Sequence, residues 1–168
     1  MRCFVGLWPD DSAAERLAAA ARDLCRHNAA ARVSSAPDLH LTLAFIGELP
    51  AEAGRPLGAE LVDRFRAPSA WTVDHAGAFS RARVLWVAGA SDPELGALAQ
   101  AVRRCLSALH VPFDAKAFVP HITLARAFRP TFPLPRLLDA PVECHFAPPR
   151  LARSVAGASD KRYEFVIP

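Results

Sequence analysis

Polar and apolar residues alternate along two short stretches of the chain, residues 38–45 and 118–126. Each stretch contains the pattern His-x-Thr-Leu-Ala. The two copies are His40-Leu41-Thr42-Leu43-Ala44 and His121-Ile122-Thr123-Leu124-Ala125. Side chains at positions i and i+2 of a β-strand share a face, so the pattern predicts two half-buried strands. In each strand the histidine and the threonine face one way and the apolar residues face the other, which is a natural way to build a site with two histidines.

The rest of the hydrophobic pattern predicts further strands and three helices. Apolar runs predict strands at 2–8, 32–34, 39–46, 71–79, 84–88, 121–128, 142–146, 150–156 and 163–167. Helical spacing predicts helices at 12–27 with a capping box at its start, at 57–66, and at 93–109 with Asp92 as the N-cap. Clustered prolines and glycines predict irregular segments at 50–58 and 130–141, and turns at 37–38, 80–83 and 157–160.

The order strand, helix, motif strand occurs once before about residue 68 and again after it. We interpret this order as an internal duplication in which each half contributes one His-x-Thr strand to a shared cleft. A chain of 168 residues is long enough for one well-buried domain. The sequence therefore predicts a single domain, residues 1–168, made of two pseudo-symmetric lobes.

Composition places the chain among globular proteins. It is 52% apolar and 22% charged, which excludes a largely disordered chain. The net charge of +3 follows the second motif, because residues 118–168 hold 7 basic and 4 acidic side chains while residues 1–117 hold 13 of each. Of the 20 basic residues 18 are arginine, which suits bidentate phosphate contacts but also fits a bias toward arginine codons. This excess falls far short of a strongly basic nucleic-acid footprint.

The cysteines and the start of the chain bear on location. The four cysteines are widely spaced and form no C-x-x-C pair: Cys3, Cys25, Cys105 and Cys144. Dispersed cysteines among apolar neighbours are typical of reduced core residues in the cytosol. The apolar run at residues 3–8 is too short for a signal peptide, and no stretch approaches the length of a membrane span. We expect a cytoplasmic protein, not attached to a membrane, and a monomer.

Two histidines are suited to moving protons in both directions near neutral pH, because an unperturbed imidazole titrates near pH 6.5. One can take a proton from a nucleophile while the other gives one to a leaving oxygen, each contributing roughly 10²- to 10⁴-fold. A threonine two residues along is placed to hydrogen-bond a charged oxygen held between them. Cleavage of a phosphodiester suits two histidines and two threonines. Charge develops on the equatorial oxygens of the phosphate, while the attacking and leaving oxygens in line need a base and an acid.

The chain resembles the 2H phosphoesterases, most closely the RNA 2′,3′-cyclic phosphodiesterase branch, also called 2′-5′ RNA ligases. The resemblance covers residues 2–167 and is carried by the paired motifs together with Phe4, Arg126, Leu151-Ala152-Arg153-Ser154 and Tyr163-Glu164. It implies a bilobal α+β fold in which antiparallel sheets from two lobes form a central cleft with helices packed outside. It also implies hydrolysis of a terminal 2′,3′-cyclic phosphate to a 2′-phosphate, with no metal and no cofactor.

The resemblance assigns a role to each motif residue. His40 would donate a proton to the leaving 3′-oxygen and His121 would activate water, while Thr42 and Thr123 would hold the non-bridging oxygens. The same site run backwards would join RNA ends by a 2′-5′ linkage. The implied partners are RNA ends or nucleotides that carry a 2′,3′-cyclic phosphate. Residues 130–141 match no pattern of the family, which leaves the RNA-contacting surface open.

The remaining candidates have two interpretations each. Thr42 and Thr123 are also good strand formers. Phe4 is a core residue that can form the floor of the pocket, and Tyr163 either stacks on a base or fills the sheet. Strict alternation from His121 puts Arg126 on the face opposite the imidazoles, so it reaches the cleft only if the strand bulges or ends there. We interpret the other four histidines as structural: His27, His75, His110 and His145.

Two other classes of function stay open beside the phosphodiesterase. The first is a catalytically weak module of the same fold that binds RNA or nucleotides, which the intact histidines and threonines disfavour. The second is a metal site that uses both histidines, for which neither motif supplies a carboxylate or cysteine as a third ligand.

Overall fold

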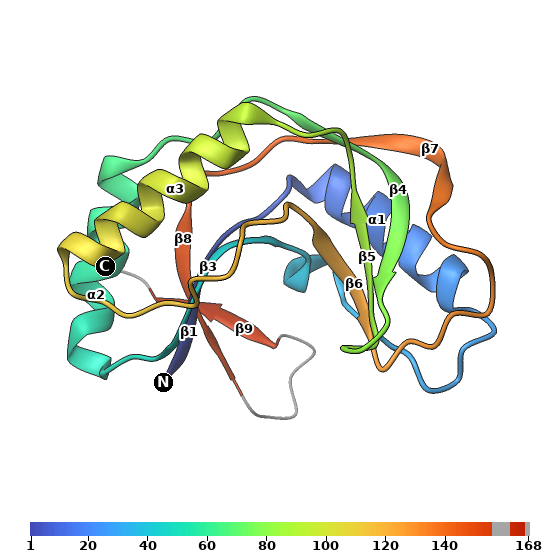
Figure 1. The fold of residues 1–168 in the computed structure, drawn as a ribbon, viewed down its shortest axis with the longest axis horizontal. Helices are drawn as coiled ribbons and strands as arrows, with labels where there is room; N and C mark the ends of the chain where they lie inside the picture. The colour runs from blue at the N-terminus through green and yellow to red at the C-terminus, as the bar shows by residue number, and fades with distance from the viewer. Residues whose placement is uncertain (156–161, 167–168) are drawn as a thin grey trace.

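The computed structural model describes residues 1–155 and 162–166 (Figure 1). Within these residues the elements are, in chain order, β1 (Arg2–Leu7), α1 (Asp11–Cys25), β2 (Arg32–Val33), the short 3₁₀ helix η1 (Ala36–Asp38), β3 (Leu41–Glu48), α2 (Ala51–Arg64), β4 (Trp71–Phe79), β5 (Val84–Ala88), α3 (Pro93–Ala108), β6 (Ile122–Arg126), β7 (Arg136–Cys144), β8 (Arg150–Ser154) and β9 (Tyr163–Phe165). The predicted turn at 157–160 and the ends of the last two predicted strands lie outside the described residues.

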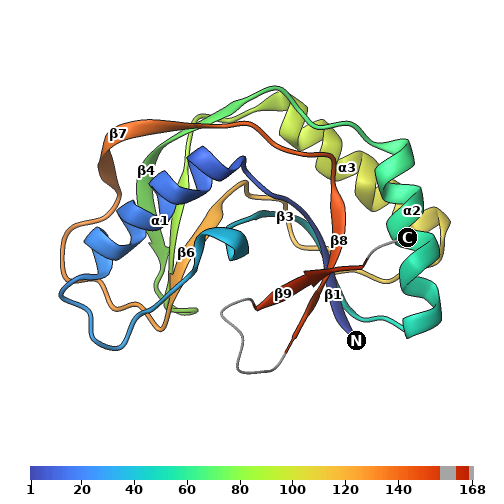
Figure 2. The same ribbon diagram turned by 180° about the vertical axis from the view of Figure 1, so that it is seen from behind.

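The strands form one antiparallel sheet, which confirms the predicted α+β class. Their order is β7-β4-β5-β6-β3-β1-β8-β9, and β2 pairs with β6 beside β3. The two motif strands, β3 and β6, are therefore neighbours, joined by the single pair Leu41 and Ile122. The sheet bends at this junction, so that the molecule has the shape of an arch with β1, β3, β8 and β9 in one arm and β4 to β7 in the other (Figures 1 and 2).

The helices are exchanged between the two arms. Helix α1, which follows β1, packs against β6 and β7 of the other arm, while α3, which precedes β6, packs against β3. Helix α2 packs against β8 (Figure 2). Each arm thus contains elements from both ends of the chain, and the arms do not correspond to the first and second halves of the sequence, although each half does supply one motif strand.

Local signals placed several elements well. The strands β4 and β5 have their predicted bounds, and β8 begins where predicted. Helix α3 begins at Pro93, with the carboxylate of Asp92 accepting the amide hydrogen of Leu95 at 2.9 Å. The four cysteines are all buried with free thiols, as predicted. Helix α1 was predicted to start at a capping box on Ser12, which is wrong, because Asp10 is the N-cap and accepts the amide hydrogen of Ala13 at 3.0 Å.

The predicted loop at 50–58 is wrong, because α2 begins at Ala51 and contains Gly54, Pro56 and Gly58. The two glycines face the ends of the chain: a Cβ on Gly54 would collide with the side chain of Met1, and one on Gly58 would lie 2.7 Å from the carbonyl oxygen of Val166. These glycines allow close packing of a helix rather than a flexible loop.

The predicted irregular segment at 130–141 is wrong over its last part, because β7 runs from Arg136 through Pro141 to Cys144. This strand lies at the edge of the sheet, where a proline without an amide hydrogen is tolerated. The motif strands also begin later than predicted, at Leu41 and Ile122, one residue after each histidine.

Candidate active site

The junction of β3 and β6 brings the four motif residues together. Leu41 and Ile122 are antiparallel partners. Continued by one residue on each side, this register sets His40 opposite Thr123 and Thr42 opposite His121. Cβ atoms directly opposite each other in such a pair lie about 4.5–5.5 Å apart, and diagonal ones about 7–8 Å. On this register we expect the two imidazoles at diagonal corners of a polar cluster with a hydroxyl beside each, and the charge of His121 does act on the pKa of His40.

The opposite face of both strands is the apolar floor that the alternation predicts. Its side chains are at most 1% exposed: Leu41, Leu43, Ile122 and Leu124. The burial sequence along the first five residues is the same in β3 and β6. The floor anchors the strands, so that the polar face is held in place by the packing of the core.

Both imidazoles are oriented in the same way by the backbone two residues earlier. Nδ1 of His40 lies 2.6 Å from the carbonyl oxygen of Asp38, and Nδ1 of His121 lies 2.8 Å from that of Val119. A carbonyl oxygen only accepts hydrogen bonds, so Nδ1–H donates in both cases. Nε2 is therefore left as the atom that exchanges a proton with a ligand, as base when the ring is neutral and as acid when it is charged.

His40 stands in an aromatic enclosure and is only 9% exposed. The rings of Phe4 and Trp8 stack on it at centroid distances of 4.6 and 5.3 Å, and the ring of Tyr163 approaches edge-on at 4.9 Å. Gly6 makes this possible, because a Cβ there would lie 3.2–3.3 Å from both stacked rings. Phe4 is thus both a buried core residue and part of the wall of the pocket that contains His40. Trp8 was not among the predicted site residues, although its position four residues after Phe4 places both side chains on the same strand face.

Burial lowers the pKa of both motif histidines. The pKa of His40 is lowered from 6.5 to about 4, chiefly by desolvation and also by the charges of Arg126 and His121, while the carbonyl and the carboxylate of Asp38 oppose the change. The pKa of His121 is also lowered, first by desolvation and then by the charge of Arg126, against its bond to Val119. Without a ligand both rings are neutral at pH 7. A bound phosphate would offset Arg126 and favour protonation of one imidazole.

This burial has a consequence for stability. Unfolded His40 takes up a proton as the pH falls below 6.5, whereas the folded protein resists it until about pH 4. Its contribution to stability is complete above pH 6.5 and falls by roughly 3 kcal/mol toward pH 4. Urea unfolding at pH 7 and pH 4.5 is therefore expected to show a smaller loss of stability in His40→Gln than in the wild type. Equal losses in the two proteins would contradict a neutral, buried His40.

A β-bulge brings Arg126 to the face of the imidazoles. In the β5–β6 pair Leu85 faces Ala125 and Trp86 faces Thr123, so that Leu124 is the extra residue. The extra residue changes the alternation by one position, which is the condition under which the sequence analysis expected Arg126 to reach the site. Arg126 accordingly lines the same pocket as His40.

The first motif strand carries a matching bulge. Gly6 pairs with Thr42 and Val5 with Ala44, so that Leu43 is the extra residue. Phe45 thus occupies in β3 the position that Arg126 occupies in β6, five residues after the histidine. It is 51% exposed and lines the pocket of His40. Phe45 was not among the predicted site residues, although it follows His40 at the same spacing at which Arg126 follows His121.

The two histidines line separate hollows. A pocket of about 470 Å³ contains His40 together with Phe4, Phe45, Asp114, Arg126 and Tyr163. A smaller one of about 280 Å³ contains His121, with Phe79 edge-on to its ring at 5.0 Å. His75, interpreted as structural, also lines this smaller pocket and bonds Asp74 at 2.7 Å.

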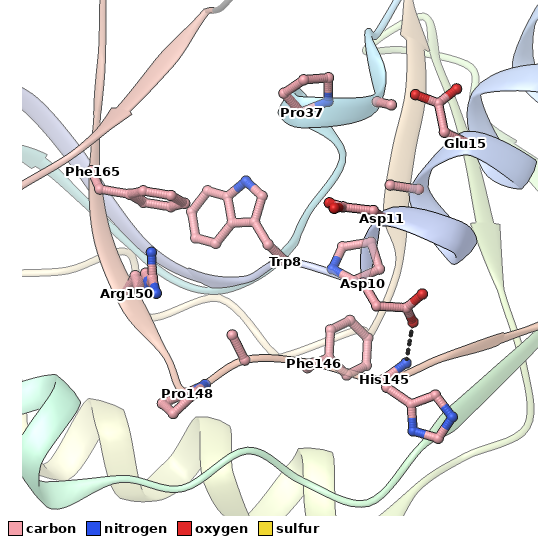
Figure 3. A pocket seen from close by; sticks show the side chains of 14 residues that line it. Trp8, Asp10, Asp11, Glu15, Pro37, His145, Phe146, Pro148, Arg150 and Phe165 are labelled. Carbon is pink, nitrogen blue, oxygen red and sulfur yellow. Dashed lines mark hydrogen bonds between the residues drawn. The ribbon is translucent and has the colours of Figure 1, made fainter.

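A larger cavity of about 870 Å³ lies beyond Trp8 but contains neither motif histidine (Figure 3). One side of it carries the carboxylates of Asp10, Asp11 and Glu15, and Arg150 and Phe165 lie on the other side with Trp8 (Figure 3). Three carboxylates against one guanidinium repel a phosphate, so we do not place the phosphodiester here.

Within the described residues no three His, Cys, Asp or Glu side chains lie close enough together to hold a metal ion. Among these residues the two motif histidines are thus not part of a group of three such side chains, whereas zinc sites in proteins use three or four protein ligands. The chemistry that this arrangement supports is acid–base catalysis on an anion held between two imidazoles.

Comparisons with known proteins agree with this chemistry. The sequence profile described as the 2′-5′ RNA ligase superfamily matches residues 9–148, well over half of the chain. The RNA 2′,3′-cyclic phosphodiesterase of Escherichia coli strain K12 is 41% identical over 100 residues, which is 58% of this chain and 56% of that protein. The protein of the same name from Thermotoga maritima is 30% identical over 131 residues, 75% of this chain and 70% of its own. The match to the E. coli protein thus spans about half of its length.

Solved structures match over nearly the whole chain. The crystal structure of E. coli LigT complexed with 3′-AMP has a TM-score of 0.80 at 29% identity and covers 98% of this chain and 94% of its own. That of TT0787 of Thermus thermophilus has a TM-score of 0.73 at 28% identity, with the same two coverages. The arch with exchanged helices is therefore shared with these proteins.

Proposed function

Because the chain belongs to the 2′-5′ RNA ligase superfamily, we propose that it hydrolyses the terminal 2′,3′-cyclic phosphate of RNA to a 2′-phosphate, by acid–base catalysis with its two motif histidines. Three relatives carry the name RNA 2′,3′-cyclic phosphodiesterase, and LigT has been crystallised with 3′-AMP and with ATP. The observation that supports the proposal is that both imidazoles flank the junction of β3 and β6 and are held through Nδ1 by a backbone carbonyl, which leaves Nε2 for a ligand.

In this mechanism His121 takes a proton from water as it attacks phosphorus, and His40 gives one to the 3′-oxygen as it leaves. This division of roles is the one that the resemblance to the 2H phosphoesterases implies, and it requires that His40, whose pKa burial lowers to about 4, is protonated in the complex with substrate. A bound phosphate would offset the charge of Arg126 and so favour the protonated form of His40. Thr42 and Thr123 would hold the non-bridging oxygens, with Arg126 opposite the developing charge.

The substrate's ribose and base would occupy the pocket of His40, against Phe4 and Tyr163. With an RNA 5′-hydroxyl as the nucleophile in place of water, the same displacement of the 3′-oxygen gives a 2′-5′ linkage. Hydrolysis should prevail because water is far more concentrated. A module that only binds nucleotides would not need both imidazoles and both hydroxyls on one face, so we do not favour it.

A test of this function is the identity of the product. We expect a 2′-phosphate from a nucleoside 2′,3′-cyclic phosphate, formed at full rate in EDTA, because the pocket holds the ribose with its 3′-oxygen next to His40. Phosphorus NMR distinguishes the two monoesters. A predominantly 3′-phosphate product would reverse the assignment of acid and base, and the absence of any product without added metal would contradict the metal-free mechanism.

The expectations of a monomer and of a cytoplasmic location stay predictions. The part of the chain that the structure describes contains no helix that is long and apolar enough to cross a membrane.

A further inference from the structure

Three arginines line a groove next to the pocket of His40. This arginine groove, of about 420 Å³, is lined by Arg32, Arg126 and Arg162 together with Ser154, Val155 and Tyr163. It continues the pocket of His40, because Arg126, Ser154 and Tyr163 line both. The groove therefore leads away from the reacting phosphate on the side where the sugar and base would lie.

The fold places two of these charges directly against each other. Arg32 of β2 and Arg126 of β6 are cross-strand partners. Like charges directly opposite in an antiparallel pair are destabilising. No ion pair among the described residues involves Arg32, Arg126 or Arg162. The repulsion is thus left without a counter-charge in this part of the chain.

The acid that lies near this groove is already bonded elsewhere. The carboxylate of Asp38 accepts the backbone amide hydrogen of Arg162 at 2.9 Å and the hydroxyl of Ser35 at 3.0 Å. Asp38 therefore ties β9 to the backbone that orients His40, and the guanidinium of Arg162 is left for another anion. An unfavourable pair such as Arg32 and Arg126, with no counter-charge from the protein, is expected at a site where a bound ligand supplies the negative charge.

We propose that the arginine groove binds backbone phosphates of the RNA chain that precede the cyclic end. This inference rests on the proposed function and adds the place where the RNA chain next to the cyclic end is held, the groove lined by Arg32, Arg126 and Arg162. A nucleoside 2′,3′-cyclic phosphate has one phosphate, which the histidines and threonines engage, and it leaves the groove without a ligand. The planar guanidinium, with its fixed fork of donors, suits successive phosphates.

The experiment compares two substrates, a nucleoside 2′,3′-cyclic phosphate and an RNA oligonucleotide that ends in the same group. In Arg32→Ala and Arg162→Ala, KM for the oligonucleotide is expected to rise about fivefold to tenfold, because the contacts are charge-assisted but open to solvent. Kinetics on the mononucleotide should change less than twofold. Arg104→Ala, an exposed arginine on α3, is the matched control and should affect neither substrate.

Salt dependence supplies a second readout. Each single-strand phosphate contact contributes about 0.7 to the slope of log affinity against log salt. Fluorescence anisotropy with the 2′-phosphate-ended oligonucleotide should therefore give a slope that is smaller by about that amount in Arg32→Ala than in the wild type. Because no turnover is needed, this measurement tests the groove even if the cyclic phosphate is not hydrolysed.

Stability supplies a third readout that is independent of ligand. Arg32→Ala removes the repulsion with Arg126, so it is expected to raise the melting temperature of the ligand-free protein. The proposal is overturned if oligonucleotide binding and its salt slope are unchanged in both arginine variants, or if KM rises equally for the two substrates. Failure of the wild type to hydrolyse either substrate would instead overturn the proposed function.

Discussion

Alanine at His40 or at His121 is expected to lower kcat for a nucleoside 2′,3′-cyclic phosphate by about 10²- to 10⁴-fold. The acid and the base act on the same phosphorus in one displacement, so the loss of either leaves the other without a partner. The double variant should consequently be little worse than either single one. Initial rates measured at the pH optimum of the wild type test this, with His145→Ala as the control, because His145 is exposed and bonds Glu143 outside the site.

The two substitutions differ in their structural cost. His40→Ala empties a space between Phe4, Trp8 and Tyr163, so a loss of activity could come from collapse of the enclosure. His40→Gln fills most of this space and can still donate to the carbonyl of Asp38, but it has no group that titrates near neutral pH. A folded and inactive His40→Gln protein would assign the loss to proton transfer. A variant at either histidine that keeps more than about a tenth of wild-type kcat would remove that residue from the mechanism.

The sequence predicts those elements of the fold that are determined by residues close together in the chain. The strands β4 and β5 and the start of α3 follow from alternation and from the Asp92-Pro93 cap, and they lie where predicted. Helix α2 was missed over its first turns because its glycines serve contacts with Met1 and Val166, residues at the two ends of the chain. Contacts between residues so far apart in the chain cannot be predicted from the local pattern of apolar and polar residues.

The candidate site also contains residues that local alternation predicts and residues whose positions depend on contacts between distant strands. A spacing of two residues on a strand predicts that His40 shares a face with Thr42 and His121 with Thr123, whereas the pairing of β3 with β6 is a property of the sheet. The positions of Arg126 and Phe45 depend on bulges, which arise from pairing with β5 and β1 and which strict alternation does not predict. The exchange of α1 and α3 between the arms is likewise a property of packing between elements distant in the chain.

Valine at Thr42 or at Thr123 is expected to lower kcat by about 10²-fold while the protein keeps its stability. Valine has the same branched shape and is as good a strand former, so the sheet should be unaffected. No hydrogen bond within the described part of the chain uses either hydroxyl, and both side chains are partly exposed. The fold therefore does not require these hydroxyls, which leaves them available to a substrate oxygen, as the proposed mechanism needs.

Thr72→Val, on the exposed face of β4, is the matched control and should leave the kinetics and the melting temperature unchanged. The pair of threonine variants also separates two mechanisms by their additivity. The threonines would hold different non-bridging oxygens, so their losses should multiply in Thr42→Val/Thr123→Val, unlike the losses at the two histidines. Steady-state kinetics of the two single variants and the double variant decide this. Unchanged kcat in both single variants would return the threonines to a role in strand formation alone, and the non-bridging oxygens would then have to be held by Arg126.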